Sequence, residues 1–251
     1  MIEVIRNPEQ MKKLRSQMTE TVGFVPTMGA LHSGHADLIQ HSVIENQSTI
    51  VSIFVNPTQF NNKEDLNKYP KTFEQDLQLC NDLGVRYLFY PDFHSIYPDD
   101  YKYKISENEF SHKLCGAHRP GHFDGVLTVV MKLLNICNPT KSYFGEKDFQ
   151  QLHLIKGMCQ AFFLDTEIVT VPTVRENSGL AMSSRNTRLS PFGLEKAALI
   201  YQIILQAKSS EEAQKLLLES DFEIDYVTDY FGRRFVAASI EGVRLIDNVQ
   251  I

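Results

Sequence analysis

Short apolar runs and stretches with helical spacing alternate along the first two thirds of the chain. The apolar runs are residues 21–27, 48–56, 85–91 and 166–176, and the run at 48–56 is β-branched and apolar almost throughout. A further short strand opens into a turn within residues 141–148. The segments with helical spacing are residues 35–47, 71–84, 125–137 and 149–163. This regular alternation predicts an α/β fold, a Rossmann-like doubly wound parallel sheet that binds ligands at the carboxyl ends of its strands.

The pattern changes after Glu176. A loop rich in Ser, Gly and Asn is followed by an amphipathic helix that starts near Ser190, and then by a charged helix at residues 210–219. A strand pair follows, with residues 223–232 as one strand and residues 233–247 as the other. We therefore predict two domains: a Rossmann-like catalytic domain at residues 1–176 and a small α+β lid domain at residues 177–251.

Composition supports a packed protein and excludes some classes of function. Hydrophobic residues make up 43% of the chain and charged residues 22%, which argues against disorder. The net charge of −6 argues against nonspecific binding to nucleic acid or to membranes. No apolar run approaches the roughly 18 residues of a membrane span, and the charged N-terminal stretch does not resemble a signal peptide.

The four cysteines are far apart in the sequence and include no CxxC pair. Separate thiols in a reducing compartment fit this spacing better than a disulfide framework does. We therefore expect a cytoplasmic protein.

Two histidines follow the first predicted strand, in PTMGALHSGH (residues 26–35). The turn between a strand and a helix is where backbone N–H groups and the helix dipole meet an anion. Gly29 and Gly34 allow the backbone to come close to a phosphate, and imidazoles can donate hydrogen bonds to its oxygens. The alternatives are turn histidines without a chemical role, and a zinc site. HxxH offers only two metal ligands, however, and no Cys or third His has a convincing spacing.

A second candidate phosphate site is AMSSRN (residues 181–186), a loop with two hydroxyls, an arginine and an asparagine. Arginine is a forked donor that suits phosphate, although the stretch taken alone also fits a solvated loop. Together, the two stretches resemble the HxGH and KMSKS-like signatures of the nucleotidyltransferase superfamily that includes class I aminoacyl-tRNA synthetases. That resemblance implies attack on the α-phosphate of ATP.

Further motifs narrow the resemblance. FVNPTQF (residues 54–60) ends a predicted strand, YFGEKDFQQL (residues 143–152) spans a strand-to-helix turn, and RLIDN (residues 244–248) stands near the C-terminus. In this order the motifs closely resemble the pantothenate synthetases, also called pantoate–β-alanine ligases. The resemblance covers most of residues 21–186 and resumes at RLIDN.

The resemblance implies a reaction in two steps. The carboxylate of pantoate attacks the α-phosphorus of ATP and releases pyrophosphate, and the amine of β-alanine then displaces AMP from pantoyl adenylate. The family also implies Mg²⁺ bound through the phosphates rather than in a protein metal site, and a homodimer.

Site residues are carried over by motif. The catalytic residues implied are His32, His35, Lys147, Ser183 and Arg185. The ATP site implied is Met28, Gly29, Ala30, Leu31, His32, Ser33, Gly34, His35, Gly145, Glu146, Lys147, Asp148, Val174, Met182, Ser183, Ser184 and Arg185. Gln59 and Gln151 match the amides that bind pantoate, Gln59 also lying near β-alanine, and an amide can bind carboxylate and hydroxyl oxygens without neutralising the nucleophile.

One departure from the family is a short C-terminal part, which lacks a stretch between the two predicted strands after residue 222. Two rival functions stay open: another HxGH adenylyltransferase, which would lack the paired FVNPTQF and FGEKDFQQL amides, and a catalytically silent nucleotide-binding protein. A tRNA synthetase is disfavoured, because the acidic chain has no basic segment for an anticodon.

Overall fold

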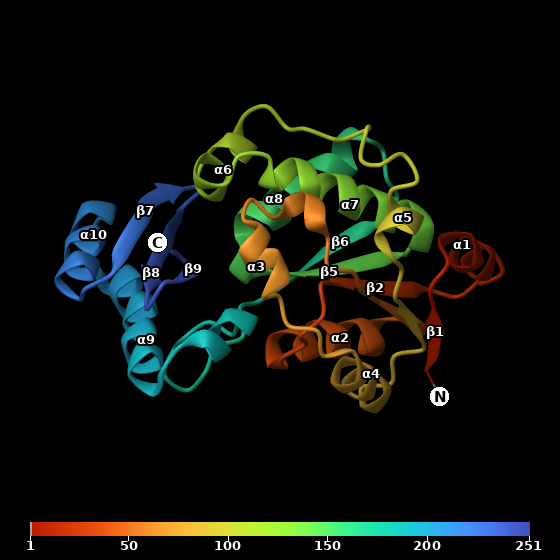
Figure 1. The fold of residues 1–251 in the computed structure, drawn as a ribbon, viewed down its shortest axis with the longest axis horizontal. Helices are drawn as coiled ribbons and strands as arrows, with labels where there is room; N and C mark the ends of the chain where they lie inside the picture. Colours follow the sequence, from red (N-terminus) through yellow and green to blue (C-terminus); the bar gives the residue numbers. More distant parts are fainter. Residues whose placement is uncertain (1) are drawn as a thin grey trace. The chain divides into compact units, whose positions relative to one another are not determined.

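The computed structural model describes residues 2–251, which fold into two compact units (Figure 1). The first unit comprises residues 2–145 and 150–171. The second comprises Pro172–Ile251 together with the short segment Glu146–Phe149. The division therefore falls five residues before the predicted one at Glu176, and it assigns residues 146–149 to the second unit rather than to the first.

The first unit is built on a six-stranded sheet in which every paired strand is parallel to its neighbour. The strands are β1 (Glu3–Ile5), β2 (Val22–Thr27), β3 (Ser48–Ile53), β4 (Tyr87–Phe89), β5 (Lys141–Gly145) and β6 (Glu167–Val171). All side chains of β3 are buried, because both faces of the sheet are covered. This confirms the predicted Rossmann-like α/β fold.

Helices cover both faces of this sheet. Figure 1 shows α2 and α4 on one face and α7 and α8 on the opposite face. The α-helices of the unit are α1 (Pro8–Ser16), α2 (Ser33–Glu45), α3 (Lys63–Asn67), α4 (Phe73–Asp82), α5 (Phe93–Ile96), α6 (Cys115–His118), α7 (His122–Cys137) and α8 (Phe149–Ala161), the last beginning at a residue of the second unit. The helix α7 is buried along most of its length.

Strand order determines where the loops of the first unit gather. The sheet runs β1-β4-β3-β2-β5-β6, so the chain moves outward from β2 to β4 and then returns to the other side of β2. The switch point therefore lies between β2 and β5, where doubly wound sheets bind their ligands. The HSGH turn follows β2, NPTQ follows β3, and GEKD follows β5.

The second unit packs two helices on a three-stranded antiparallel sheet. Its elements are α9 (Pro191–Gln206), α10 (Ser210–Glu219), β7 (Glu223–Tyr230), β8 (Arg233–Ile240) and β9 (Val243–Gln250). A buried apolar cluster joins the two helices to the sheet. Ser190 caps α9 by accepting a hydrogen bond from the backbone N–H of Gly193, which agrees with the predicted start of that helix.

Two predictions for secondary structure were incomplete. The stretch at residues 233–247 is not one strand but β8 and β9, joined at Glu241 and Gly242. Both of these residues have positive φ, as do Phe231 and Gly232 between β7 and β8, and two such residues in a row suit tight hairpin turns. The N-terminal β1 and α1 were not predicted, and the three residues of β1 are too few to show a strand period.

Across residues 2–251, no helix is both long and apolar enough to cross a membrane.

Gly23 on β2 brings α2 close to the sheet, because a Cβ there would overlap Ser42 Oγ and the Asn46 amide. Gly23→Ala should lower the free energy of unfolding by about 1–3 kcal/mol, measured by urea denaturation. Gly157→Ala on α8 is the matched control, since a Cβ there meets no atom within 4 Å. It should be neutral or stabilising by up to about 1 kcal/mol. Equal losses in both variants would contradict this account of Gly23.

Candidate active site

The HSGH turn of the first unit places both histidines at the N-terminus of α2. His32 is the N-cap residue, and its Nδ1 accepts a hydrogen bond from the backbone N–H of Gly34 (3.1 Å). The Nδ1 of His35 accepts from the backbone N–H of His32 (3.4 Å), which completes a capping box. The two half-buried rings lie 4.1 Å apart, centroid to centroid.

These hydrogen bonds determine which nitrogen of each ring carries the proton. A backbone N–H can only donate, so both Nδ1 atoms are acceptors, and each neutral ring carries its hydrogen on Nε2. Both rings therefore present an N–H donor at the positive end of a 13-residue helix. Such an arrangement suits hydrogen bonding to an anion.

Asp76 on α4 holds the turn that leads to these histidines. Its side chain is buried, and it accepts hydrogen bonds from the backbone N–H groups of Ala30 (3.0 Å) and Leu31 (2.8 Å) and from the Thr72 hydroxyl (3.1 Å). The turn needs this support, because Ala30 has a φ of 50°. Gly29 has a φ of 84°, and a Cβ there would be crowded as well, 3.0 Å from Ile53 and 3.1 Å from the Asp76 carboxylate.

The predicted pantoate residue Gln59 lies in the turn that follows β3. Its Nε2 contacts the sulfur of Met28 (3.0 Å), so the structure brings the turns after β2 and β3 together. The buried amide of Asn56 donates to Gln59 Oε1 (3.1 Å) and to the carbonyl of Gly125 on α7 (3.1 Å). Burial raises the pKa of Tyr97 to about 12, so its hydroxyl stays protonated and donates to Asn56 Oδ1 (3.0 Å).

Gly125 lets α7 pack directly against this turn. A Cβ at this position would lie 2.6 Å from the carbonyl oxygen of Thr58 and 2.8 Å from the backbone nitrogen of Gln59. Both contacts are with backbone, which cannot swing away as a side chain can. The glycine thus sets the position of the turn that carries Gln59.

The neighbouring glutamines Gln150 and Gln151 at the start of α8 have different surroundings. Gln150 is buried and uses its whole amide on backbone: it accepts from Cys115 N (3.1 Å) and donates to the carbonyls of Phe110 and Lys113 (both 2.8 Å). Gln151 is half-buried, and the structure records no side-chain hydrogen bond from it to any residue in 2–251. This difference agrees with Gln151, rather than Gln150, as the candidate ligand-binding amide.

The other predicted residues lie in the second unit, apart from Gly145, which ends β5 in the first. The lysine turn, Glu146–Asp148, is a single 3-10 turn, and Lys147 Nζ lies 3.7 Å from the Asp148 carboxylate. Val174 pairs with Met182 through a backbone hydrogen bond (3.0 Å), which closes the hairpin before the serine–arginine loop, residues 182–185. In that loop, Ser183 Oγ accepts from the backbone N–H of Arg185 (3.2 Å) and caps the turn Ser184–Arg188.

Three positioning residues were missed from the sequence: Asp76, Asn56 and Gly125. Asp76 had a usable signal, because it lies three residues after Phe73 and four before Cys80, on the same face of the helix as these two apolar residues. A carboxylate on an apolar helix face needs buried donors, but the sequence does not identify them. Asn56 lies inside the FVNPTQF motif, and nothing in its spacing separates its role from that of Gln59.

Both the sequence and the fold match known proteins. The sequence profile of the pantoate–β-alanine ligase family matches residues 3–250. The chain belongs to the pantoate–β-alanine ligase family. It is 57% identical to a pantothenate synthetase of Bdellovibrio bacteriovorus over the full length of both chains. A pantothenate synthetase of Coxiella burnetii is 45% identical over 99% of this chain and 97% of the relative.

Solved structures of this family have the same fold. Pantoate–β-alanine ligase from Francisella tularensis, in complex with beta-gamma ATP and β-alanine, matches with a TM-score of 0.94 and 43% identity over 100% of this chain and 98% of that one. Pantothenate synthetase from Thermus thermophilus matches with a TM-score of 0.90 and 37% identity over 99% of both chains. The short C-terminal part expected to depart from the family is thus shared with these ligases.

Asp76→Asn should reduce the turnover of the ligase at least about tenfold, because one carboxylate oxygen that accepts from the backbone becomes an amide donor facing an N–H group. The measurement is kcat, with circular dichroism to confirm the fold. Asp82→Asn on the same helix is the control, since Asp82 is exposed and its carboxylate accepts a hydrogen bond from the Gln78 side chain (2.7 Å) rather than from the turn. Unchanged kcat in Asp76→Asn would contradict the role given to Asp76.

Proposed function

We propose that this chain condenses pantoate with β-alanine at the expense of ATP, giving pantothenate, AMP and pyrophosphate. The observation that carries this function is the full-length match to the ligase family. The HSGH turn adds a physical reason, because two Nε2–H donors at a helix N-terminus suit the phosphates of ATP. Function in the biosynthesis of pantothenate follows from the product.

The chemistry needs positioning and charge stabilisation more than covalent catalysis by the protein. A carboxylate oxygen of pantoate bonds to the α-phosphorus as the bond to pyrophosphate breaks. The amine of β-alanine then bonds to the acyl carbon of pantoyl adenylate, AMP leaves, and the amine loses a proton. In this scheme His32 and His35 donate hydrogen bonds to phosphate oxygens as negative charge develops.

Residues of the second unit are assigned to ATP as well. We assign Lys147, Ser183 and Arg185 to its phosphates, Asp148 to its ribose or metal, and the backbone at Val174 to adenine. The support is the chemistry of each group: an ammonium and a guanidinium bind phosphate, while a carboxylate accepts from ribose hydroxyls. The remaining residues of the ATP site keep the assignments that their motifs imply.

Gln59 and Gln151 are assigned to pantoate, and Gln59 also to β-alanine. Asn56 orients the Gln59 amide by donating to its Oε1, which leaves the Gln59 Nε2 hydrogens for acceptors such as Met28 sulfur or a substrate oxygen. Neutral amides bind a carboxylate without removing the charge that makes it a nucleophile.

Mg²⁺ is proposed to enter with ATP. Among residues 2–251, no group of three His, Cys, Asp or Glu is placed to hold a metal ion. Mg²⁺ usually keeps several waters and is bound by substrate phosphates together with one or two protein carboxylates, so the half-exposed Asp148 beside Lys147 fits such a site. The ion would offset phosphate charge.

Location and assembly are proposals too. The four cysteines are buried free thiols at separate places in the fold, which suits a reducing compartment such as the cytoplasm. We infer a homodimer from membership of the family, and light scattering of the purified protein tests it.

The function is tested by incubating the purified chain with ATP, Mg²⁺ and the two acids. AMP and pantothenate should form only when both pantoate and β-alanine are present. AMP transfer to a phosphorylated acceptor instead, or ATP binding without any turnover, would overturn the proposal and favour one of the two rival functions.

His35→Ala should lower kcat at least about 100-fold in the same assay, the scale of losing a key hydrogen-bond donor to the transition state. His41→Ala is the matched control: it lies on the same helix, half-exposed, and its ring contacts Asp37 and Glu45 rather than the turn. That variant should stay within about twofold of the parent. Near-normal turnover of His35→Ala would refute the role given to the HSGH turn.

The two adjacent glutamines should respond differently to leucine. Gln151→Leu should raise KM for pantoate about tenfold or more with little change in the free energy of unfolding, because Gln151 bonds no described residue. Gln150→Leu should lower that free energy by about 2 kcal/mol or more, since the buried N–H of Cys115 loses its acceptor and the carbonyls of Phe110 and Lys113 each lose one of their two donors. The reverse pattern would show that Gln150 is the substrate-binding amide.

A further inference from the structure

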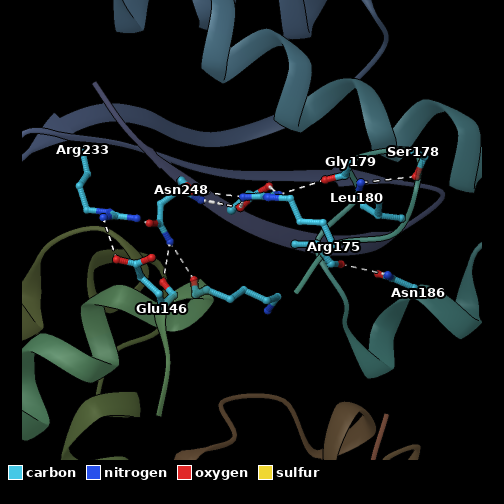
Figure 2. Close-up of polar contacts among 11 residues, drawn as sticks. Glu146, Arg175, Ser178, Gly179, Leu180, Asn186, Arg233 and Asn248 are labelled. Carbon is cyan, nitrogen blue, oxygen red and sulfur yellow. Dashed lines mark hydrogen bonds and ion pairs between the residues drawn. The ribbon is translucent and has the colours of Figure 1, made fainter. Parts of the chain in front are cut away.

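RLIDN, the last motif of the chain, has two consecutive polar residues that are almost fully buried. Asp247 and Asn248 lie on β9 with 6% and 3% of their surface exposed. Buried polar groups destabilise a fold unless they are hydrogen-bonded. The hydrogen-bond partners of Asp247 and Asn248 therefore indicate the role of these two residues. Figure 2 shows that the contacts from this strand lead to two different loops.

Asp247 holds the hairpin that precedes the serine–arginine loop. Its carboxylate accepts two hydrogen bonds from the guanidinium of Arg175 (2.6 and 2.9 Å). Arg175 also donates to the carbonyl of Gly179 (3.0 Å) and lies over the Tyr201 ring, 3.8 Å from its centroid. A forked pair of this kind fixes direction as well as distance. The hairpin that leads into residues 182–185 is therefore oriented from β9.

Asn248 holds the lysine turn. Its Nδ2 donates to the backbone carbonyls of Glu146 (3.1 Å) and Lys147 (3.0 Å), and its Oδ1 accepts from Arg233 Nε (2.8 Å). Arg233 also pairs with the Glu146 carboxylate (3.0 Å). Only an amide can donate twice and accept once from this position. These contacts explain why residues 146–149 belong with the second unit although they follow β5 in the chain.

The first residue of the motif contacts the serine–arginine loop directly. Arg185 donates to the backbone carbonyl of Arg244 at the start of RLIDN (3.4 Å). One strand thus contacts the lysine turn through Asn248, the hairpin through Asp247, and the loop itself through the backbone of Arg244.

We propose that Asp247 and Asn248 are positioning residues that hold Lys147 at a fixed place relative to Ser183 and Arg185, so that these three groups can bind the phosphates of one ATP molecule. This inference rests on the proposed function, because the function is what assigns these groups to ATP. Neither positioning residue needs to touch ATP. Their effect should appear in ATP binding and be absent from pantoate binding.

The test compares Asn248→Asp and Asp247→Asn with Asp229→Asn. Asn248→Asp keeps the acceptor for Arg233 but loses both donors to the lysine turn, and Asp247→Asn weakens the pair with Arg175. Asp229 is the matched control: it makes a similar forked pair with the buried Arg234 in the same unit, yet neither residue bonds either loop.

KM for ATP, and Kd for a nonhydrolysable ATP analogue measured by calorimetry, should rise at least about tenfold in Asn248→Asp and Asp247→Asn. KM for pantoate should stay within about twofold, and Asp229→Asn should leave all three constants within about twofold. Urea denaturation of each variant separates this effect from loss of stability. If Asn248→Asp or Asp247→Asn fails to fold, Arg175→Lys replaces it. Lysine keeps the positive charge but cannot make the two parallel hydrogen bonds to Asp247, so KM for ATP and Kd for the analogue should again rise.

Equal rises in KM for ATP and KM for pantoate, or ATP constants no different from those of Asp229→Asn, would overturn the inference. Failure of the proposed function looks different: the unmodified chain would make no pantothenate with ATP and both acids. An active parent with unaffected positioning variants would leave the function in place and remove only the role of β9.

Discussion

The buried carboxylate of Asp76 is the interaction on which the candidate anion site of the first unit depends. The chain leaves β2 through two residues with positive φ, Gly29 and Ala30, and a non-glycine residue in that conformation is strained. Hydrogen bonds from the backbone N–H groups of Ala30 and Leu31 to Asp76 offset the strain, and they also satisfy the buried carboxyl oxygens. Only after this turn does His32 reach the N-cap of α2. The histidines are therefore positioned from another helix.

The same physical principle operates in the second unit. The lysine turn and the serine–arginine loop contain few buried apolar side chains that could fix them by packing. Polar side chains of β9 and β8 hold them instead, by pairing with their backbone carbonyls and with Arg175. A loop that must present polar groups to a charged ligand cannot bury an apolar face, so hydrogen bonds from a rigid sheet are the available means of ordering it.

Chemically similar side chains have different roles because they are buried to different extents. Gln150 and Gln151 are chemically identical and adjacent, yet the helix turns one into the protein and leaves the other half-buried. Asn56 and Gln59 differ in the same way. The Asn56 amide donates to the Gly125 carbonyl on α7 and to Gln59 Oε1, so it orients the Gln59 amide. In each pair one amide organises the loops and the other is the candidate for a ligand.

Much of the fold could be predicted from the sequence, because its signals are local. Apolar runs and helical spacing predicted the parallel sheet and its principal helices, and the motifs placed the candidate residues at the carboxyl ends of β2, β3 and β5. Local pattern failed where an element was too short, as at β1, or where a tight turn interrupted a continuous apolar run, as between β8 and β9. What only the tertiary structure decided is which distant side chains hold the loops. Asp76 with the backbone at 30–31, and Asn248 with the backbone at 146–147, pair across long separations in the chain, and a backbone N–H or carbonyl carries no residue-specific signal in the sequence.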